Sequence, residues 1–173
     1  MSDHDAQITE RVIFRVNPAL HTAINDLAES ANRSINGEIC TAVDKWLYQR
    51  DSLVLMKDRL LSSASEKTIE EIRRSTPAYL ITQDAVPDTL KTTVRFKDSV
   101  SEDLRDAWLR HKEQSGHVSM NTYLKIVVAW WLTYSFQLAE CAKAIHQDFM
   151  NSIRPSRGGN TVNLSTYGCL AIT

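Results

Sequence analysis

The chain has 173 residues, of which 43% are hydrophobic and 24% charged, and its formal net charge is -1. This composition is typical of one globular domain or two small ones, and it excludes a chain that is disordered throughout. The cysteines, Cys40, Cys141 and Cys169, are odd in number and far apart, which argues against a disulfide framework. Residues 1–17 do not resemble a signal peptide, and the longest nearly apolar run, residues 126–139, is shorter than a membrane span. We therefore expect a cytoplasmic protein without a membrane partner.

Signatures of catalysis and of metal binding are missing from the sequence. The histidines show no spacing that would place two imidazoles on one helical face beside a carboxylate or thiolate. The sequence also lacks a phosphate-binding glycine loop, a nucleophile elbow and a paired-carboxylate motif. We expect neither an enzyme nor a protein that holds a metal or another cofactor.

The first predicted elements follow a flexible stretch, residues 1–9, and begin with a short strand. Side chains alternate with period two from residue 11 to 16, so one face of this strand is expected in the core and the other is free. Asn17 and Pro18 then supply an N-cap and a first helical position for an amphipathic helix. The core face holds Val12, Phe14 and Val16, and the free face holds Arg11, Ile13 and Arg15.

A turn at Asn32 and Arg33 leads to a second helix, which Ser34 caps. Because no Gly or Pro intervenes beyond Tyr48, we expect this helix to continue without a break to about Leu61. The first unit then spans residues 10–62. Residues 63–90 are expected to form a short connecting helix, at 66–74, and a mostly extended linker.

The second half of the chain repeats this order, at residues 91–150. Residues 34–47 (SINGEICTAVDKWL) align without gaps on residues 119–132 (SMNTYLKIVVAWWL), with five identities in fourteen positions. A strand precedes each copy, and the free face of the second strand holds Lys91, Thr93 and Arg95. Between strand and cap the second copy is about five residues longer, so either its first helix gains a turn or its strand–helix loop grows.

The end of the second unit is predicted to be one long helix followed by a tail. Apolar spacing carries this helix to about Met150, and the polar, Gly-rich residues 151–173 predict a flexible tail. Trp130 and Trp131 are expected in the core of this helical region and not at a ligand site.

The repeated order of strand, helix, short turn, Ser cap and second helix resembles the ribbon-helix-helix family of the Arc and MetJ repressors. The segment NRSINGEI, residues 32–39, is similar to the turn between the two helices of Arc. In that family the strands of two units pair into an antiparallel ribbon that lies in the DNA major groove. The resemblance implies a mainly α fold with short β-strands, in which a two-stranded ribbon is joined to a bundle of long helices. It implies base reading by Arg11, Ile13, Arg15, Lys91, Thr93 and Arg95. It also implies phosphate binding, with backbone amides as the main donors, by Ser34, Ile35, Asn36, Ser119, Met120 and Asn121.

The chemistry of these residues agrees with such a role. Arg and Lys can donate to guanine, Thr can donate or accept, and an apolar Ile can meet a thymine methyl group. A helix N-terminus can hold a phosphate without a basic side chain, which would offset the net charge of -1, a value that argues against nucleic-acid binding. Arc also has a buried Arg-Glu-Arg triad. Arg33 and Glu38 match two of its members but Ala42 stands at the third position, so we interpret any remaining pair as structural, with surface exposure left open.

We therefore expect sequence-specific binding of double-stranded DNA, in a bacterial or phage transcriptional repressor. The alternatives are an accessory protein of a relaxosome or of plasmid partition, an antitoxin, or a protein-interaction module. The linker of residues 63–90 is long enough for the two copies to pair within one chain, whereas the five-residue difference between them favours a homodimer. Assembly of several such units on DNA is compatible with either arrangement.

Overall fold

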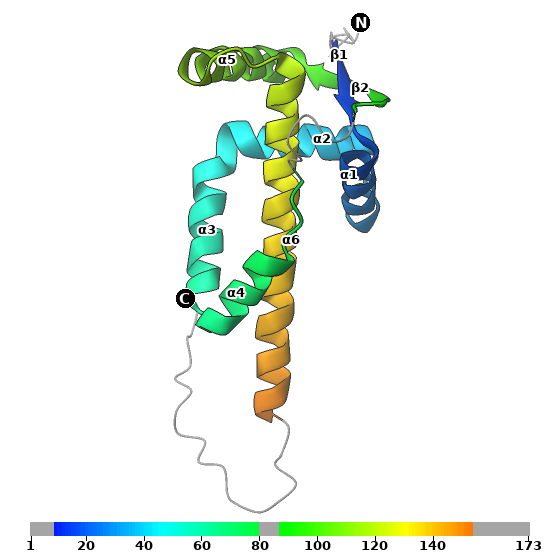
Figure 1. The fold of residues 1–173 in the computed structure, drawn as a ribbon. Coiled ribbons are helices and arrows are strands. Elements are labelled where there is room, and N and C mark those ends of the chain that lie inside the picture. Colours follow the sequence, from blue (N-terminus) through cyan, green and yellow to red (C-terminus); the bar gives the residue numbers. More distant parts are fainter. Residues whose placement is uncertain (1–8, 80–86, 154–173) are drawn as a thin grey trace, which may run out of the picture.

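The computed structural model describes residues 9–79 and 87–153, and these form a mainly helical protein with a two-stranded sheet at one end (Figure 1). The sheet lies above the crossing of α2 and α6, while α3, α4 and the second half of α6 form the opposite end. The elements in chain order are β1 (Thr9–Val16), α1 (Pro18–Ser30), α2 (Ile35–Asp44), a π-helical turn η1 (Lys45–Gln49), α3 (Arg50–Ser62), α4 (Glu66–Ser75), β2 (Leu90–Lys97), α5 (Asp98–Ser115) and α6 (Met120–Ile153).

The two strands form an antiparallel ribbon within one chain. Strand β1 comes from the first sequence repeat and β2 from the second, and they pair over eight positions from Thr9↔Lys97 to Val16↔Leu90. The expected antiparallel ribbon is therefore present, and it is intramolecular. Residues 80–86 of the connection lie outside the described part of the chain.

The core lies directly beneath this ribbon. Phe14, Val16, Val94 and Phe96, which alternate along the two strands, are at most 1% exposed. The predicted strand faces are thus confirmed, although Val12, opposite Val94 near the middle of the ribbon, is only half-buried. The strand residues pack against apolar side chains of all four neighbouring helices: Leu20, Ile24, Ile39, Val43, Leu104, Leu124 and Val128.

The helix termini follow the local sequence signals. The Asn17 side chain accepts a hydrogen bond from the Leu20 amide and Pro18 opens α1, as predicted. Gly116 ends α5 at a φ of 83°, in the left-handed region that glycine tolerates. Helix α5 has 18 residues against 13 in α1, so the extra residues of the second repeat lengthen its first helix and leave the strand–helix connection short.

The expectation of one unbroken helix from Ser34 to about Leu61 is wrong. Helix α2 ends at Asp44, and after the π-helical turn η1 the backbone of Gln49 has φ -132° and ψ 1°, outside the helical region. A π turn interrupts the regular hydrogen-bond ladder and rotates the following side chains. The chain bends there, and α3 runs beside α6 instead of continuing α2 (Figure 1).

Helix α6 agrees more closely with expectation, since it ends at Ile153, three residues beyond Met150. Residues 151–153 are therefore helical and not part of a flexible tail, and Thr9, predicted to be flexible, is the first residue of β1. The rest of the two predicted flexible segments, residues 1–8 and 154–173, lies outside the described residues. The connecting helix predicted at 66–74 is α4. Among residues 9–79 and 87–153, no helix combines the length and the apolar character that crossing a membrane requires.

Candidate nucleic-acid interface

The free face of the ribbon brings together all six residues predicted to read bases. Each side chain is exposed to solvent, and even the apolar Ile13 is 58% exposed. The strand register fixes their neighbours, since each of these residues lies directly opposite another one. The pairs are Arg11 with Arg95, Ile13 with Thr93, and Arg15 with Lys91.

This face is rich in positive charge that the protein itself does not neutralise. In the described part of the chain, none of the five cationic residues on the two strands forms an ion pair. Two of the three pairs set like charges opposite each other, an arrangement that destabilises a sheet. Lys97, also exposed, extends the same face at the end of β2. The net charge of -1 therefore conceals a locally cationic ribbon.

The N-termini of α2 and α6 lie at opposite edges of the ribbon. The Ser34 hydroxyl oxygen accepts from the Gly37 amide at 3.0 Å, and Ser119 accepts from the Thr122 amide at 3.1 Å. Both serines are thus helix caps, as the repeat predicts. The first two helical amides, those of Ile35 and Asn36 in α2, have no acceptor within their own helix and can receive a phosphate oxygen.

The side chains of Asn36 and Asn121 bind the strand edges, which leaves the predicted phosphate contact to the backbone amides, the main donors expected from the sequence. Asn121 accepts from the Arg15 amide at 2.7 Å and donates to the Arg15 carbonyl at 3.0 Å, which holds the edge of β1. Asn36 accepts from the Arg95 amide at 2.9 Å and holds the edge of β2. Their side chains therefore satisfy exposed strand edges, and only their backbone amides remain for phosphate.

Cys40 completes the second of these edge contacts. Its thiol lies 3.3 Å from the Arg95 carbonyl oxygen, to which it donates. Burial raises the pKa of the Cys40 thiol, so the group stays protonated and can act as a donor at neutral pH. Each strand edge is thus bound by the second helix of the other repeat.

Arg33 and Glu38, which match two of the three members of the Arc triad, form an ion pair in which Arg33 is partly exposed and Glu38 is buried. Arg33 Nη1 lies 2.7 Å from Glu38 Oε2, and the Glu38 side chain is only 2% exposed. Trp131 of α6 donates its Nε1 to the other carboxylate oxygen of Glu38, at 2.6 Å. The two oxygens of the buried Glu38 carboxylate are thus bound by Arg33 and Trp131, while Ala42, at the third triad position, is fully buried and apolar.

A second tryptophan makes the symmetry-related contact. Trp46 of the first repeat donates its Nε1 to the Tyr123 hydroxyl at 2.9 Å. In the repeat alignment, Trp46 corresponds to Trp131 and Glu38 to Tyr123, so each tryptophan binds the other repeat in the same way. Sequence reasoning missed these contacts, although the identity of the two tryptophans in the alignment was a signal for them.

The described residues offer no competing metal site of the usual kinds. In residues 9–79 and 87–153, no three His, Cys, Asp or Glu side chains come together as they would around a metal ion. No protein-family model matches the sequence, and comparison with curated proteins and with solved structures finds no similar protein. The ribbon face and its two flanking helix N-termini are the candidate site.

Proposed function

We propose that this protein binds double-stranded DNA in a sequence-dependent manner, with the β1–β2 ribbon in the major groove, as a single-chain member of the ribbon-helix-helix class. The observation that carries the proposal is the uncompensated cationic face, in which Arg11 opposes Arg95 and Arg15 opposes Lys91. Cross-strand pairs of like charge weaken the free protein, and a polyanion between them removes the repulsion. The proposed role in the cell is transcriptional repression.

The shape of the region supports the same partner. The major groove admits a two-stranded ribbon, and exposed Arg, Lys and Thr side chains can hydrogen-bond to the edges of base pairs. The N-termini of α2 and α6 are anchored to opposite edges of the ribbon through Asn36 and Asn121. Their amides would then face the phosphates on either side of the groove, which fixes the position of the ribbon without further basic side chains.

The two halves of the ribbon are chemically different, and this predicts the form of the DNA site. One half presents Arg11, Ile13 and Arg15, and the other presents Lys91, Thr93 and Arg95. A homodimeric ribbon reads two identical half-sites, whereas this ribbon would read unequal ones. We therefore propose an imperfect palindrome as the preferred site. Replacing Ile13 with Thr makes the central pair identical and should shift selection toward a symmetric site.

The test begins with selection of a preferred duplex from a random library, followed by fluorescence anisotropy at fixed salt. Arg15→Ala and Arg95→Ala should each weaken specific binding by about 1–3 kcal/mol, a loss of about 5- to 150-fold. Arg59→Ala, at an exposed position of α3 at the end of the molecule away from the ribbon, is the matched control and should bind normally. Native affinity in both ribbon variants would falsify base reading by this face.

A further inference from the structure

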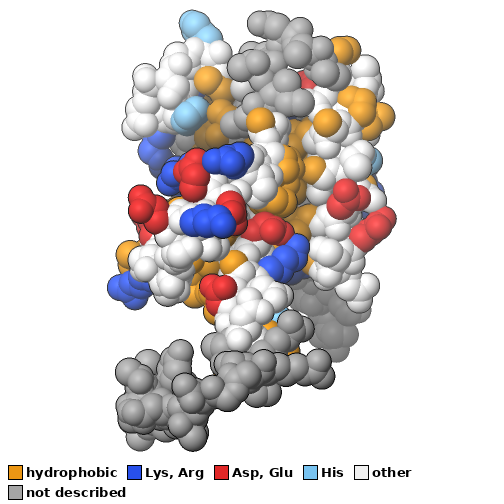
Figure 2. Space-filling view, turned by 60° about the horizontal axis from the view of Figure 1, so that its bottom comes forward, with side chains coloured by type: hydrophobic (Ala, Val, Ile, Leu, Met, Phe, Trp, Pro, Cys, Tyr) orange, Lys and Arg blue, Asp and Glu red, His pale blue; other side chains and the backbone are white. Residues whose placement is uncertain are grey.

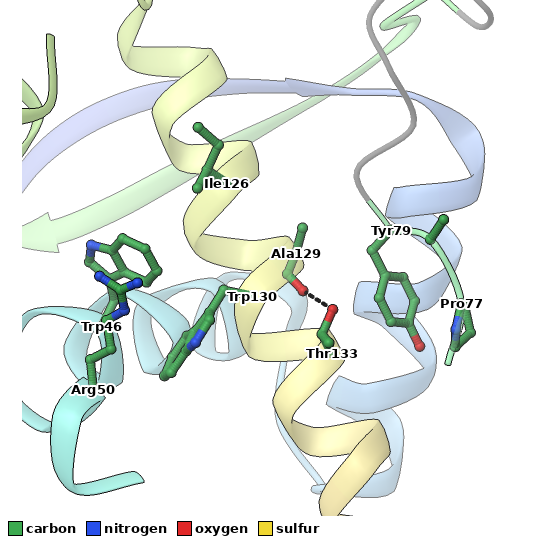
Figure 3. A pocket seen from close by; sticks show the side chains of 9 residues that line it. Trp46, Arg50, Pro77, Tyr79, Ile126, Ala129, Trp130 and Thr133 are labelled. Atoms are coloured by element: carbon green, nitrogen blue, oxygen red, sulfur yellow. Dashed lines mark hydrogen bonds between the residues drawn. The ribbon is translucent and has the colours of Figure 1, made fainter. Parts of the chain in front are cut away.

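A cavity of about 420 Å³ lies between η1, the start of α3, residues 77–79 and α6 (Figure 3). Its volume falls within the range of small-molecule binding sites. The side chains that matter for its chemistry are Trp46, Arg50, Tyr79, Ile126, Trp130 and Thr133. Figure 2 shows that hydrophobic side chains gather at the centre of the face seen from the helical end, with charged side chains on both sides.

The walls of the cavity are aromatic. The ring centroids of Trp46 and Trp130 lie 5.4 Å apart with their planes at 76°, so the two indoles meet edge to face. The Tyr79 ring stands on the other side of α6 in Figure 3, and both tryptophans are only half-buried. This differs from the expected core position of Trp130. Aromatic surfaces in a concave site favour a flat, apolar ligand.

A single cation stands at this aromatic wall. The Arg50 guanidinium lies 4.0 Å from the ring centroid of Trp46, stacked over its face as Figure 3 shows. Within the described residues no carboxylate forms an ion pair with it, although its side chain is exposed. A guanidinium held in place by an indole keeps its outward N–H groups free for a planar anion such as a carboxylate.

The irregular backbone between α2 and α3 places Trp46 and Arg50 beside α6. Trp46 belongs to the π-helical turn η1, and Arg50 is the first residue of α3 after the break at Gln49. An unbroken α-helix would have continued in the direction of α2 and would not have placed α3 beside α6. Single π turns inside helices occur frequently at functional sites, because they are retained despite poorer hydrogen bonding.

We propose that this cavity binds a small planar aromatic carboxylate, with its ring against the indoles of Trp46 and Trp130 and its carboxylate on the Arg50 guanidinium. The ligand would contact Trp46, which donates a hydrogen bond to Tyr123 of α6. The same helix carries Asn121, which binds the edge of β1. The proposal concerns ligand binding and does not depend on DNA binding.

Naphthoate is a suitable probe, and naphthylmethanol is a neutral control of similar shape. Titrations of the full chain are followed in nitrogen–proton correlation spectra of the tryptophan indoles, assigned with single Trp→Phe variants. The signals of Trp46 and Trp130 should move and saturate with naphthoate. The signal of Trp108, whose Nε1 donates to the Val118 carbonyl next to α5, should stay in place.

Arg50→Gln separates the ionic contact from apolar binding. The variant should bind naphthoate about tenfold more weakly, as expected for loss of a charge-assisted hydrogen bond, and should bind naphthylmethanol as the native protein does. Arg59→Gln, an equal charge change further along α3, should leave both affinities unchanged. Two results would overturn the proposal: no saturable movement of the Trp46 and Trp130 signals at about 10 mM naphthoate, or an Arg50→Gln variant with native affinity for naphthoate.

Discussion

Reversing one charge on the ribbon should stabilise the free protein while it abolishes DNA binding. Arg95 lies directly opposite Arg11, and Lys97 follows on the same face, so Arg95→Glu turns a repulsive cross-strand pair into an attractive one. A cross-strand charge pair contributes roughly 0.2–1 kcal/mol. Reversing one charge both removes a repulsion and adds an attraction, so the two contributions add. We therefore expect a gain of about 1 kcal/mol in the free energy of unfolding. For a chain of this length the Tm should rise by about 2–4 °C.

Thermal unfolding is followed by circular dichroism at about 20 mM and about 1 M salt. The gain should be present at low salt and nearly vanish at high salt, because exposed charges are screened within about 3 Å at 1 M. Arg59→Glu should not raise the Tm, because Arg59 lies in a helix and no cation stands opposite it on a neighbouring strand. In addition, the helix dipole favours a positive charge in the last turn of α3, where Arg59 lies. A lower Tm for Arg95→Glu than for the native protein at low salt would refute the repulsion on which the proposed function depends.

Four further substitutions test the support of the ribbon and one exposed hydrogen bond. Phe14→Ala should cost about 3–5 kcal/mol, because the ring is fully buried and leaves a cavity; a Tm within a degree of the native value would contradict the assigned core face. Asn121→Ala should accelerate amide exchange at the β1 edge more than Asn36→Ala does at the β2 edge. The reason is that Asn121 makes two hydrogen bonds to its strand and Asn36 makes one. Equal protection in both variants would disprove this difference. The hydrogen bond from Tyr48 to Asp103, 2.5 Å long, raises the pKa of Tyr48 to about 12, so the stability that this contact contributes is present below pH 10 and lost as the pH rises to 12. In an ultraviolet titration, Asp103→Asn should move one phenol back toward its ordinary range, and an unchanged titration curve would show that this bond does not form.

The ribbon and its two faces were predictable because they depend on local patterns. Period-two alternation at residues 11–16 and 91–96 gave the buried and free faces, and the gap-free alignment of the two caps gave the second helices. The Ser34 cap and the positive φ of Gly116 likewise follow from residue chemistry over a few positions. Such signals survive in a single sequence, because each is decided by neighbours along the chain.

Features that depend on contacts between distant segments were not predictable in the same way. No Gly or Pro marks the break at η1 in the sequence. The bend is stabilised instead by the packing of α3 on α6, which involves residues far apart in the chain. The side-chain roles of Asn36 and Asn121 depend on which strand edge each helix meets, and a helix cap looks the same in sequence whether or not a strand lies beside it. Burial of Glu38 required knowledge of Trp131, 93 positions away.

Both strands of the ribbon belong to one polypeptide, and this changes how the structure is completed during synthesis. A ribbon built from two chains forms in a second-order reaction, and its population falls on dilution. Here β1 cannot pair until residues 90–97 have been synthesised, and until then Phe14 and Val16 are not fully buried. At about 5–20 residues per second this delay lasts several seconds or more, during which an unpaired edge strand can join other chains. Once β2 arrives, closure is first-order, so the ribbon stays paired at any protein concentration, including a few molecules per cell.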